Sequence, residues 1–357
     1  MKSLNYILKI IFLISLLLSY SCSKKNALLK SEISNEQLIA FVKDGSKIFL
    51  IDAKGENEIQ IYEAENKKIV SLAWSMNDNY LTFFENSDDE ASLVILNLND
   101  LTSKTLYNYN VLPKKNLTPV FRNDTTVIFS TEKEIVECDF SSNYRVLVRD
   151  KSIIDFCFLP TQNSILYSND SSLVRIDLES NKRSEIFYRK NNYPFDNISV
   201  SVDESKILFS SGNTIFVFGN ADSSFLISQI ERDLPVFWLE WFRDKIIFQT
   251  GIKSGERGVH NFRQNLRRQF QGKMAFYISD IFGKNQKQFY RKIETASMGN
   301  PDLSNDLDYI TLISNSLNSK RKVFLLSIES GNLLRLSSNG HADYPTWQNG
   351  NNFVTSN

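Results

Sequence analysis

The sequence has few of the residues that most often build metal-dependent or thiol-based sites. Its 357 residues include only two histidines, His260 and His341, so the imidazole clusters used by metal-dependent lyases are excluded. A GxSxG nucleophile motif, a CxxC pair and a phosphate-binding loop are also absent from the sequence. We therefore interpret both histidines as surface residues and expect a protein without catalytic activity, bound metal or other cofactor.

Net charge and cysteine are scarce as well. The 41 basic residues balance the 41 acidic ones, so the chain lacks the electrostatic footprint of a nucleic-acid-binding protein. Of the three cysteines, Cys138 and Cys157 each lie in an apolar run, IVECDF and IIDFCF. An oxidising compartment would allow these two to pair, but buried free thiols are the favoured interpretation.

Long apolar runs are missing except at the start of the chain. There, Lys2 and Lys9 precede an apolar stretch over residues 10–18, and small residues follow it. This pattern is typical of a secretory signal, predicted over residues 1–21, because its apolar part is too short for a comfortable membrane span. The exported form would then be close to neutral.

The residues LSYSC, which end at Cys22, resemble the lipobox of bacterial lipoproteins, in which the cysteine becomes the lipid-bearing first residue. Ser19 stands where that motif usually has leucine, and Ser19 with Ser21 also fits ordinary signal peptidase, so plain secretion is the alternative. With a lipidated Cys22, the polar residues 22–35 would be a tether that holds the next domain off the membrane. Ser23 lacks the aspartate that retains some lipoproteins at the inner membrane, so the resemblance favours the outer membrane.

A pattern of short strand-like runs begins at Ser71 and returns until the C-terminus. Residues 71–106 read SLAWSMNDNYLTFFENSDDEASLVILNLNDLTSKTL, three apolar runs and a weaker fourth, separated by turns of Asn, Asp and Ser. Such a pattern indicates a four-stranded antiparallel meander, and the 12% aromatic content suits strands. One meander cannot bury both of its faces, so copies of it must stack against one another.

The copies can be aligned on an apolar anchor residue near the end of their first run. Successive anchors are about 37 to 47 residues apart, with one interval of about 62, within or near the period of four-stranded propeller blades. The seven anchors are Trp74, Phe121, Phe158, Val200, Trp241, Leu303 and Trp347. The sequence therefore predicts an all-β propeller over residues 36–357.

The two ends of this region complement each other. The opening runs, residues 36–69, lack a partner equivalent to the run that ends at Trp74, whereas the last anchor has little chain after it. This predicts a seven-bladed ring in which residues 341–357 join residues 36–69, since closure leaves only short, protected strand edges. Residues 38–42 and 353–356 both fit the second strand of the closing blade. Six blades is the alternative if the weak copy at Phe121 is miscounted.

The last copies resemble the tandem repeat of TolB-type propellers, in which a Pro-x-Trp-Ser-Pro-Asp-Gly turn precedes a strand ending in Phe. Pro345 and Trp347 match this turn, whereas Gln348 and Asn349 replace its Ser and Asp. The resemblance covers nearly all of the mature chain and implies a TolB-like, WD40-like propeller. Such propellers serve as components of envelope complexes, as binding platforms and as accessory domains of peptidases.

One segment between Trp241 and Leu303 interrupts the repeat. This insert, residues 251–273, has six basic residues and one acidic residue, with apolar residues at helical spacing. A short amphipathic helix could present its arginines to carboxylates, phosphates or anionic lipid headgroups, so replacing them with Ser would weaken pull-down or liposome binding. The alternative is a solvated loop. The candidate partner-binding residues are Arg257, Arg263, Arg267 and Arg268.

Two other candidate sites have simpler explanations. The acidic turn at residues 87–90 could hold calcium, but it lacks the alternating ligand spacing of a known loop and is interpreted as a solvated hairpin tip. Trp238 and Trp241, with Phe237 and Phe242, could form a carbohydrate platform. Their place in or beside an innermost strand favours core packing instead.

Together these features favour an exported, lipid-anchored, non-catalytic propeller of the cell envelope, present as a monomer. Its face or central opening would bind an unknown envelope protein or polymer. The alternative is a hydrolase or lyase that acts on an extracellular polysaccharide or peptide, with acidic residues at the central opening. A third interpretation is a pairing subunit whose partner carries the activity. Inward-pointing carboxylates with a bound metal would favour the enzyme, and a bare polar channel would favour the binding protein.

Overall fold

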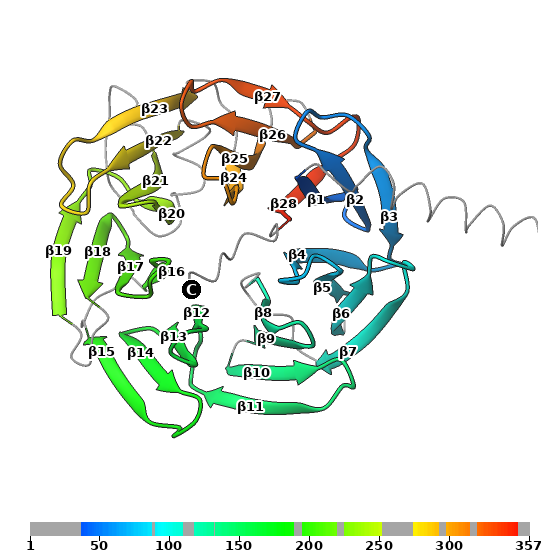
Figure 1. Ribbon diagram of the computed structural model, residues 1–357, viewed down its shortest axis with the longest axis horizontal. Coiled ribbons are helices and arrows are strands. Elements are labelled where there is room, and N and C mark those ends of the chain that lie inside the picture. Colours follow the sequence, from blue (N-terminus) through cyan, green and yellow to red (C-terminus); the bar gives the residue numbers. More distant parts are fainter. Residues whose placement is uncertain are drawn as a thin grey trace, which may run out of the picture.

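The computed structural model is a ring of seven four-stranded antiparallel sheets (Figure 1). It describes residues 37–87, 90–109, 118–131, 133–188, 195–219, 225–251, 274–292, 298–314 and 320–348. Within these ranges the regular elements are strands, and no helix there is long and apolar enough to cross a membrane. The prediction of a seven-bladed all-β propeller is confirmed. The six-blade alternative is wrong, because the copy at Phe121 forms a complete blade.

The blades are numbered from the closing blade, and the strands of each are given from the innermost to the outermost. Blade 1 contains β28 (Ala342–Trp347), β1 (Leu38–Lys43), β2 (Lys47–Asp52) and β3 (Ile59–Glu63). Blade 2 contains β4 (Lys68–Trp74), β5 (Tyr80–Asn86), β6 (Ala91–Asn97) and β7 (Ser103–Tyr109). Blade 3 contains β8 (Val120–Asn123), β9 (Thr126–Ser130), β10 (Glu134–Asp139) and β11 (Tyr144–Arg149).

The remaining four blades follow in chain order. Blade 4 contains β12 (Asp155–Leu159), β13 (Ser164–Ser168), β14 (Ser172–Asp177) and β15 (Arg183–Tyr188). Blade 5 contains β16 (Asp196–Val200), β17 (Lys206–Ser211), β18 (Thr214–Gly219) and β19 (Phe225–Glu231). Blade 6 contains β20 (Val236–Phe242), β21 (Lys245–Gly251), β22 (Met274–Ser279) and β23 (Lys287–Lys292). Blade 7 contains β24 (Met298–Leu303), β25 (Tyr309–Ser314), β26 (Lys322–Ser327) and β27 (Leu333–Arg335).

The alternating strand directions give the ring two distinct faces. The innermost strands all begin on one side, which we call the front face. Because neighbouring strands are antiparallel, the turns between second and third strands and the ends of the outermost strands lie on this side too. The other side, the back face, holds the remaining turns. As a second strand, β1 starts at the back face, so the described chain enters the ring there.

The ring closes in blade 1, where the last strand pairs with the first. Strand β28 lies antiparallel to β1, with Trp347 opposite Ile39 and Ala342 opposite Lys43. The amide of Gln348 donates to the carbonyl oxygen of Leu38 at 2.8 Å and extends this pairing. Closure by the two chain ends is therefore confirmed. Residues 38–42 form the second strand of the blade, and residues 353–356 lie outside the described residues.

All seven predicted anchors lie on innermost strands. Two of them join neighbouring blades through their indole groups. Nε1 of Trp74 donates to the carbonyl oxygen of Thr346 at 3.2 Å, and Nε1 of Trp347 donates to that of Asp302 at 3.2 Å. Both indoles are almost fully buried. Each therefore buries apolar surface between two blades, and its N–H group is hydrogen-bonded across the same interface.

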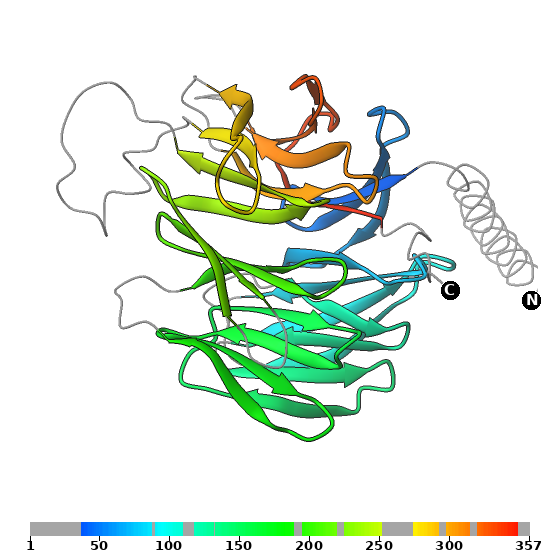
Figure 2. The same cartoon turned by 60° about the vertical axis from the view of Figure 1, so that its left-hand side comes forward.

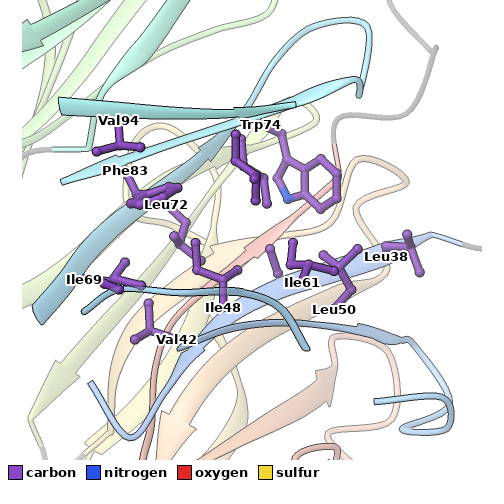
Figure 3. Close-up of a cluster of buried hydrophobic side chains, with 14 residues drawn as sticks. Leu38, Val42, Ile48, Leu50, Ile61, Ile69, Leu72, Trp74, Phe83 and Val94 are labelled. Atoms are coloured by element: carbon purple, nitrogen blue, oxygen red, sulfur yellow. The ribbon is translucent and has the colours of Figure 1, made fainter. Parts of the chain in front are cut away.

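The core is divided among the interfaces between blades. Figure 3 shows the cluster between blades 1 and 2, where Val42 and Ile48 pack with Leu72 and Phe83. Figure 2 shows neighbouring sheets packed face to face around the ring. The middle strands are covered on both faces and are therefore continuously apolar, as in TIFVFG of β18. Outer strands such as β7 expose polar side chains.

Several predictions lie outside the described residues. These are the signal peptide over residues 1–21, the lipidation site Cys22 and the tether over residues 22–35. Strand β21 includes Gly251, and the rest of the insert, residues 252–273, is also outside. The same holds for the insert's candidate residues and its histidine, which are Arg257, His260, Arg263, Arg267 and Arg268.

Candidate functional site

A cavity of about 640 Å³ lies at the front end of the central channel. Every blade contributes to its wall, mostly through residues near the start of its innermost strand, the seven strands around the centre of Figure 1. One wall residue from each blade, in chain order, is Ser71, Thr118, Asp155, Asp196, Phe237, Asp302 and Asp343. The cavity is thus a product of the whole ring.

The backbone around the cavity departs from regular strand geometry. The pairing register shifts in β4 between Val70 and Ala73, and in β16 between Asp196 and Ser199. Strands β20, β24 and β28 have similar shifts in the segments that line the cavity. A β-bulge bends its strand and redirects side chains. In these five strands, residues that regular pairing would point at a neighbouring blade are therefore turned toward the channel.

Three residues in these irregular segments have left-handed backbone conformations. They are Ser71, Asn197 and Tyr344, with φ angles of 55°, 56° and 50°, and all three line the cavity. Such a conformation costs an L-residue on the order of 1 kcal/mol, and the surrounding structure must maintain it. Backbone strain of this kind concentrates at binding and catalytic sites.

The cavity wall is acidic. It contains four aspartates, and Arg321 is the one basic residue among the described residues that line it. The carboxylate of Asp155 accepts a hydrogen bond from the amide of Ile198 at 2.9 Å, and that of Asp302 accepts one from Trp347 at 2.8 Å. Asp343 forms an ion pair with Arg321 at 2.7 Å. The carboxylates of Asp155, Asp302 and Asp343 are therefore fixed in position by residues of the neighbouring blade.

Three carboxyl groups of the channel have raised pKa values, and for Asp343 burial outweighs the opposing charge of Arg321. Burial raises the pKa of Asp302 to about 6, although hydrogen bonds from Trp347 and Thr346 oppose the rise. Below the cavity, burial raises the pKa of Glu240 to about 7, and the charges of Asp302 and Asp155 add to that effect. Glu240 also accepts hydrogen bonds from Ser199 and from its neighbour Trp241. The charge of the channel therefore changes near neutral pH.

This arrangement suits the binding of a cationic group. Carboxylates held by backbone amides can accept charge-assisted hydrogen bonds from an ammonium or guanidinium group. Within the described ranges, no three His, Cys, Asp or Glu side chains are placed so that they could hold a metal ion together.

The hydrolase or lyase alternative predicted acidic residues at the central opening without naming them. A usable signal exists, because Asp155, Asp196, Asp302 and Asp343 each precede an anchor residue by one to four positions. An aspartate just before the anchor in four of the seven copies is unexpected in a strand that packs against its neighbours. The aspartates could therefore have been found by aligning the copies.

The aromatic group around Trp241 is divided between the core and the cavity. Trp241 is buried between blades 5 and 6, and Trp238 and Phe242 pack partly buried against the cluster between blades 6 and 7. For these residues, core packing is confirmed. Phe237 differs, because 39% of its surface is exposed and it lines the cavity. The bulge in β20 turns it away from the core.

The remaining predictions concern thiols and a histidine. Cys138 and Cys157 are both free, as favoured, and burial raises their pKa values to about 11 and about 12. Both thiols are therefore poorly ionised at neutral pH and should react slowly. His341 is exposed at the start of β28, as predicted. In the acidic turn at residues 87–90, Asp88 and Asp89 lie outside the described residues.

No protein-family profile and no curated protein sequence matches the chain. Solved structures do match it. TolB from Acinetobacter baumannii has a TM-score of 0.51 at 14% identity, over 87% of this chain and 66% of that one. A putative 6-phosphogluconolactonase from Bacteroides fragilis NCTC 9343 has a TM-score of 0.61 at 11% identity, over 88% of this chain and 98% of that one. A structure from an analysis of two prolyl endopeptidases has a TM-score of 0.58 at 9% identity, over 86% of this chain and 50% of that one.

These likenesses concern the fold. The chain spans slightly less than two thirds of the TolB structure and half of the endopeptidase structure. The TolB-like β-propeller fold is thereby confirmed. The same fold occurs in proteins that bear the names of enzymes, so it is compatible with binding and with catalysis.

Proposed function

We propose that the protein is a non-catalytic binding propeller of the cell envelope, whose central cavity holds a cationic segment of an envelope protein or polymer. The observation that carries this proposal is the cavity wall, where four aspartates face a single arginine. In a recess with walls of low dielectric, like charges reinforce one another and attract an oppositely charged group. The raised pKa values of Asp302 and Glu240 support this picture, since the proximity of carboxylates contributes to the rise for Glu240.

The size of the cavity limits what can enter it. A volume of about 640 Å³ is in the range of sites for small ligands, so it suits a few side chains or the end of a chain and excludes a folded domain. Phe237 adds one exposed aromatic surface to the wall, over which a cationic group could lie. The ligand would therefore be a short lysine- or arginine-bearing segment, or an amine-bearing polymer.

The position of β1 supports an orientation at the membrane. The described chain enters the ring at the back face, and the cavity lies at the front face. A tether from a lipidated Cys22 would reach β1 from the back, so the cavity would point away from the membrane. In this proposal the protein is a monomer anchored at the outer membrane or the periplasmic face, and the insert with Arg257, Arg263, Arg267 and Arg268 is a second contact to the partner.

The test is a titration of the purified protein with hexalysine, in which calorimetry measures the binding. Replacing two wall residues, Asp155→Asn and Asp196→Asn, should weaken binding about tenfold, because two charges are lost while the side chains keep their shape. The matched control is Asp124→Asn with Asp244→Asn, which removes the same charge from exposed turns of the back face. An equal loss in the control variant, or no loss in the cavity variant, would overturn the proposal.

A hydrolase or lyase is the second candidate function. The observation that favours it is the pair Asp302 and Glu240, because carboxyl groups with pKa values near 6 and 7 can act as general acids. Assays with envelope polysaccharides and peptides would support this function if turnover occurs and is lost in Asp302→Asn. Turnover that survives this substitution would exclude the site.

A further inference from the structure

A second recess on the front face lies at the rim, between blades 3 and 4. This recess, the rim groove, has a volume of about 1000 Å³. Its walls come from the turn before β10, from the link between β11 and β12 and, in blade 4, from the turn before β14 and from residues of β14 and β15. Four basic side chains line it, namely Lys133, Arg149, Lys151 and Arg183.

Asp150 organises the floor of the rim groove. Its carboxylate accepts hydrogen bonds from the hydroxyl of Tyr167 at 2.9 Å, from Nδ2 of Asn169 at 3.1 Å and from the guanidinium of Arg183 at 2.6 Å. Burial acts to raise the pKa of Asp150, but the hydrogen bonds from Asn169, Tyr167 and Arg183 outweigh it and lower the pKa. Asp150 is therefore ionised and fully engaged, and it holds Arg183 in place over the ring of Tyr167.

The other acidic groups at the rim groove are engaged as well. Glu185 accepts a hydrogen bond from the hydroxyl of Ser172 at 2.7 Å, and Glu134 pairs with Arg149 at 2.9 Å. Lys133 and Lys151 are exposed and have no acidic partner among the described residues. The positive charge of these two lysines is thus available to a ligand.

The corresponding recess between blades 1 and 2 is different. It has a volume of about 760 Å³ and is lined by two glutamates, Glu63 and Glu65, and two lysines, Lys67 and Lys68. Glu63 pairs with Lys47 at 3.3 Å, and Lys67 pairs with Glu85 at 3.1 Å. The architecture of the rim alone therefore does not produce a basic recess. The excess of positive charge is a property of the groove between blades 3 and 4.

We propose that the rim groove binds a short anionic saccharide that carries carboxylate or phosphate groups. A planar guanidinium held from one side, as in Arg183, can still donate to a carboxylate or phosphate from its other edge, and the two lysines supply further charge. Val174 is the one apolar side chain among the described lining residues, and it is only 3% exposed. Because protein interfaces depend on apolar or aromatic anchors, an acidic peptide fits this groove less well than a hydroxyl-rich anion.

The experiment is a titration of the whole exported chain with trigalacturonate, a carboxylated saccharide, with maltotriose as its uncharged counterpart. Glucose 6-phosphate distinguishes recognition of phosphate from recognition of carboxylate. We expect trigalacturonate or glucose 6-phosphate to bind and maltotriose not to bind. Lys133→Ser with Lys151→Ser should weaken the binding about three- to tenfold, and added salt should weaken it further.

Lys67→Ser with Lys68→Ser is the matched control, because it removes two lysines from the equivalent recess between blades 1 and 2. All four lysines are on the surface, so thermal melting should show that both variants fold. The proposal is overturned if neither anion binds, if the control variant loses as much affinity as the groove variant, or if hexaglutamate binds as tightly as the saccharide. The hexaglutamate outcome would identify the groove as a site for acidic peptides.

Discussion

The central cavity and the rim groove share the front face of the ring, but they are built in opposite ways. The cavity is lined by all seven blades, mostly through their innermost strands, with strained backbone and three carboxylates fixed by amides or an ion pair. The groove is lined by turns and outer strands of two blades, with four basic side chains around one engaged carboxylate. None of the described residues that line the groove has a left-handed conformation.

The difference separates two ways in which a propeller can acquire a charged site. At the centre, the positions of Asp155, Asp302 and Asp343 depend on the neighbouring blade, so the site depends on ring closure. At the rim, a pair of surface lysines sets the charge, so the site can change without affecting the ring. Replacing residues at the centre should therefore lower the free energy of unfolding. Replacing the lysines at the rim should weaken binding and leave the free energy of unfolding nearly unchanged.

The largest expected effect is at the closing strand. Trp347→Ala removes an almost fully buried indole and its hydrogen bond to Asp302, and we expect it to lower the free energy of unfolding by about 3–5 kcal/mol. Arg149→Ala, in the groove, loses only an exposed ion pair and should cost less than about 1 kcal/mol. Urea unfolding followed by tryptophan fluorescence and circular dichroism measures both values. Similar losses would contradict the contrast between centre and rim.

An intermediate effect is expected from pH, because two carboxyl groups of the central channel titrate near neutrality. Asp302 and Glu240 lose their protons as the pH rises through about 6 and about 7, so the cavity becomes more negative. Hexalysine should therefore bind about tenfold more tightly at pH 8 than at pH 5. Binding of trigalacturonate should stay nearly constant, because lysine and arginine remain charged over this range. Loss of the pH dependence in Asp302→Asn would confirm its origin.

The same two groups also affect stability, with the opposite sign. Their pKa values are raised in the folded chain, so the folded state keeps protons that the unfolded state has released. The free energy of unfolding should therefore fall as the pH rises from about 4 to about 7, by about 1.4 kcal/mol for each unit by which a pKa is raised. Glu240→Gln should flatten this part of the curve, which urea unfolding at a series of pH values would measure. A curve unchanged by the substitution would assign the slope to other groups.

The sequence predicted the ring well because anchors and apolar runs reflect burial that repeats in every blade. Trp74 and Trp347 were found in this way, and their indoles prove to join adjacent blades. The cavity residues were missed because bulges vary the spacing between aspartate and anchor: Asp302 directly precedes Leu303, whereas Asp196 lies four positions before Val200. A bulge depends on pairing with the next strand, so one strand's sequence does not reveal it. The left-handed position in the bulge of β16 holds Asn197, so no glycine marks it in the sequence.

The groove was missed for a different reason. Lys133, Lys151 and Arg183 are far apart in the sequence and belong to different turns and strands. Each of these segments is as polar as surface segments usually are, so none of them is conspicuous. They meet only because blades 3 and 4 pack side by side. Sequence spacing within one repeat contains no information on this contact, since the contact joins one blade to the next.

The smallest expected effect concerns the strained backbone of the cavity. Ser71 is buried and has a φ angle of 55°, a conformation that glycine adopts without the steric cost of a Cβ atom. Ser71→Gly should therefore raise the free energy of unfolding by about 0.5 kcal/mol, after subtraction of the cost that comes from the greater conformational entropy of glycine in the unfolded chain. Ser172→Gly, at a buried strand position of the groove without a left-handed conformation, should lower it by about 1 kcal/mol. Opposite signs in parallel urea titrations would show that strain belongs to the cavity, and equal signs would show that it does not.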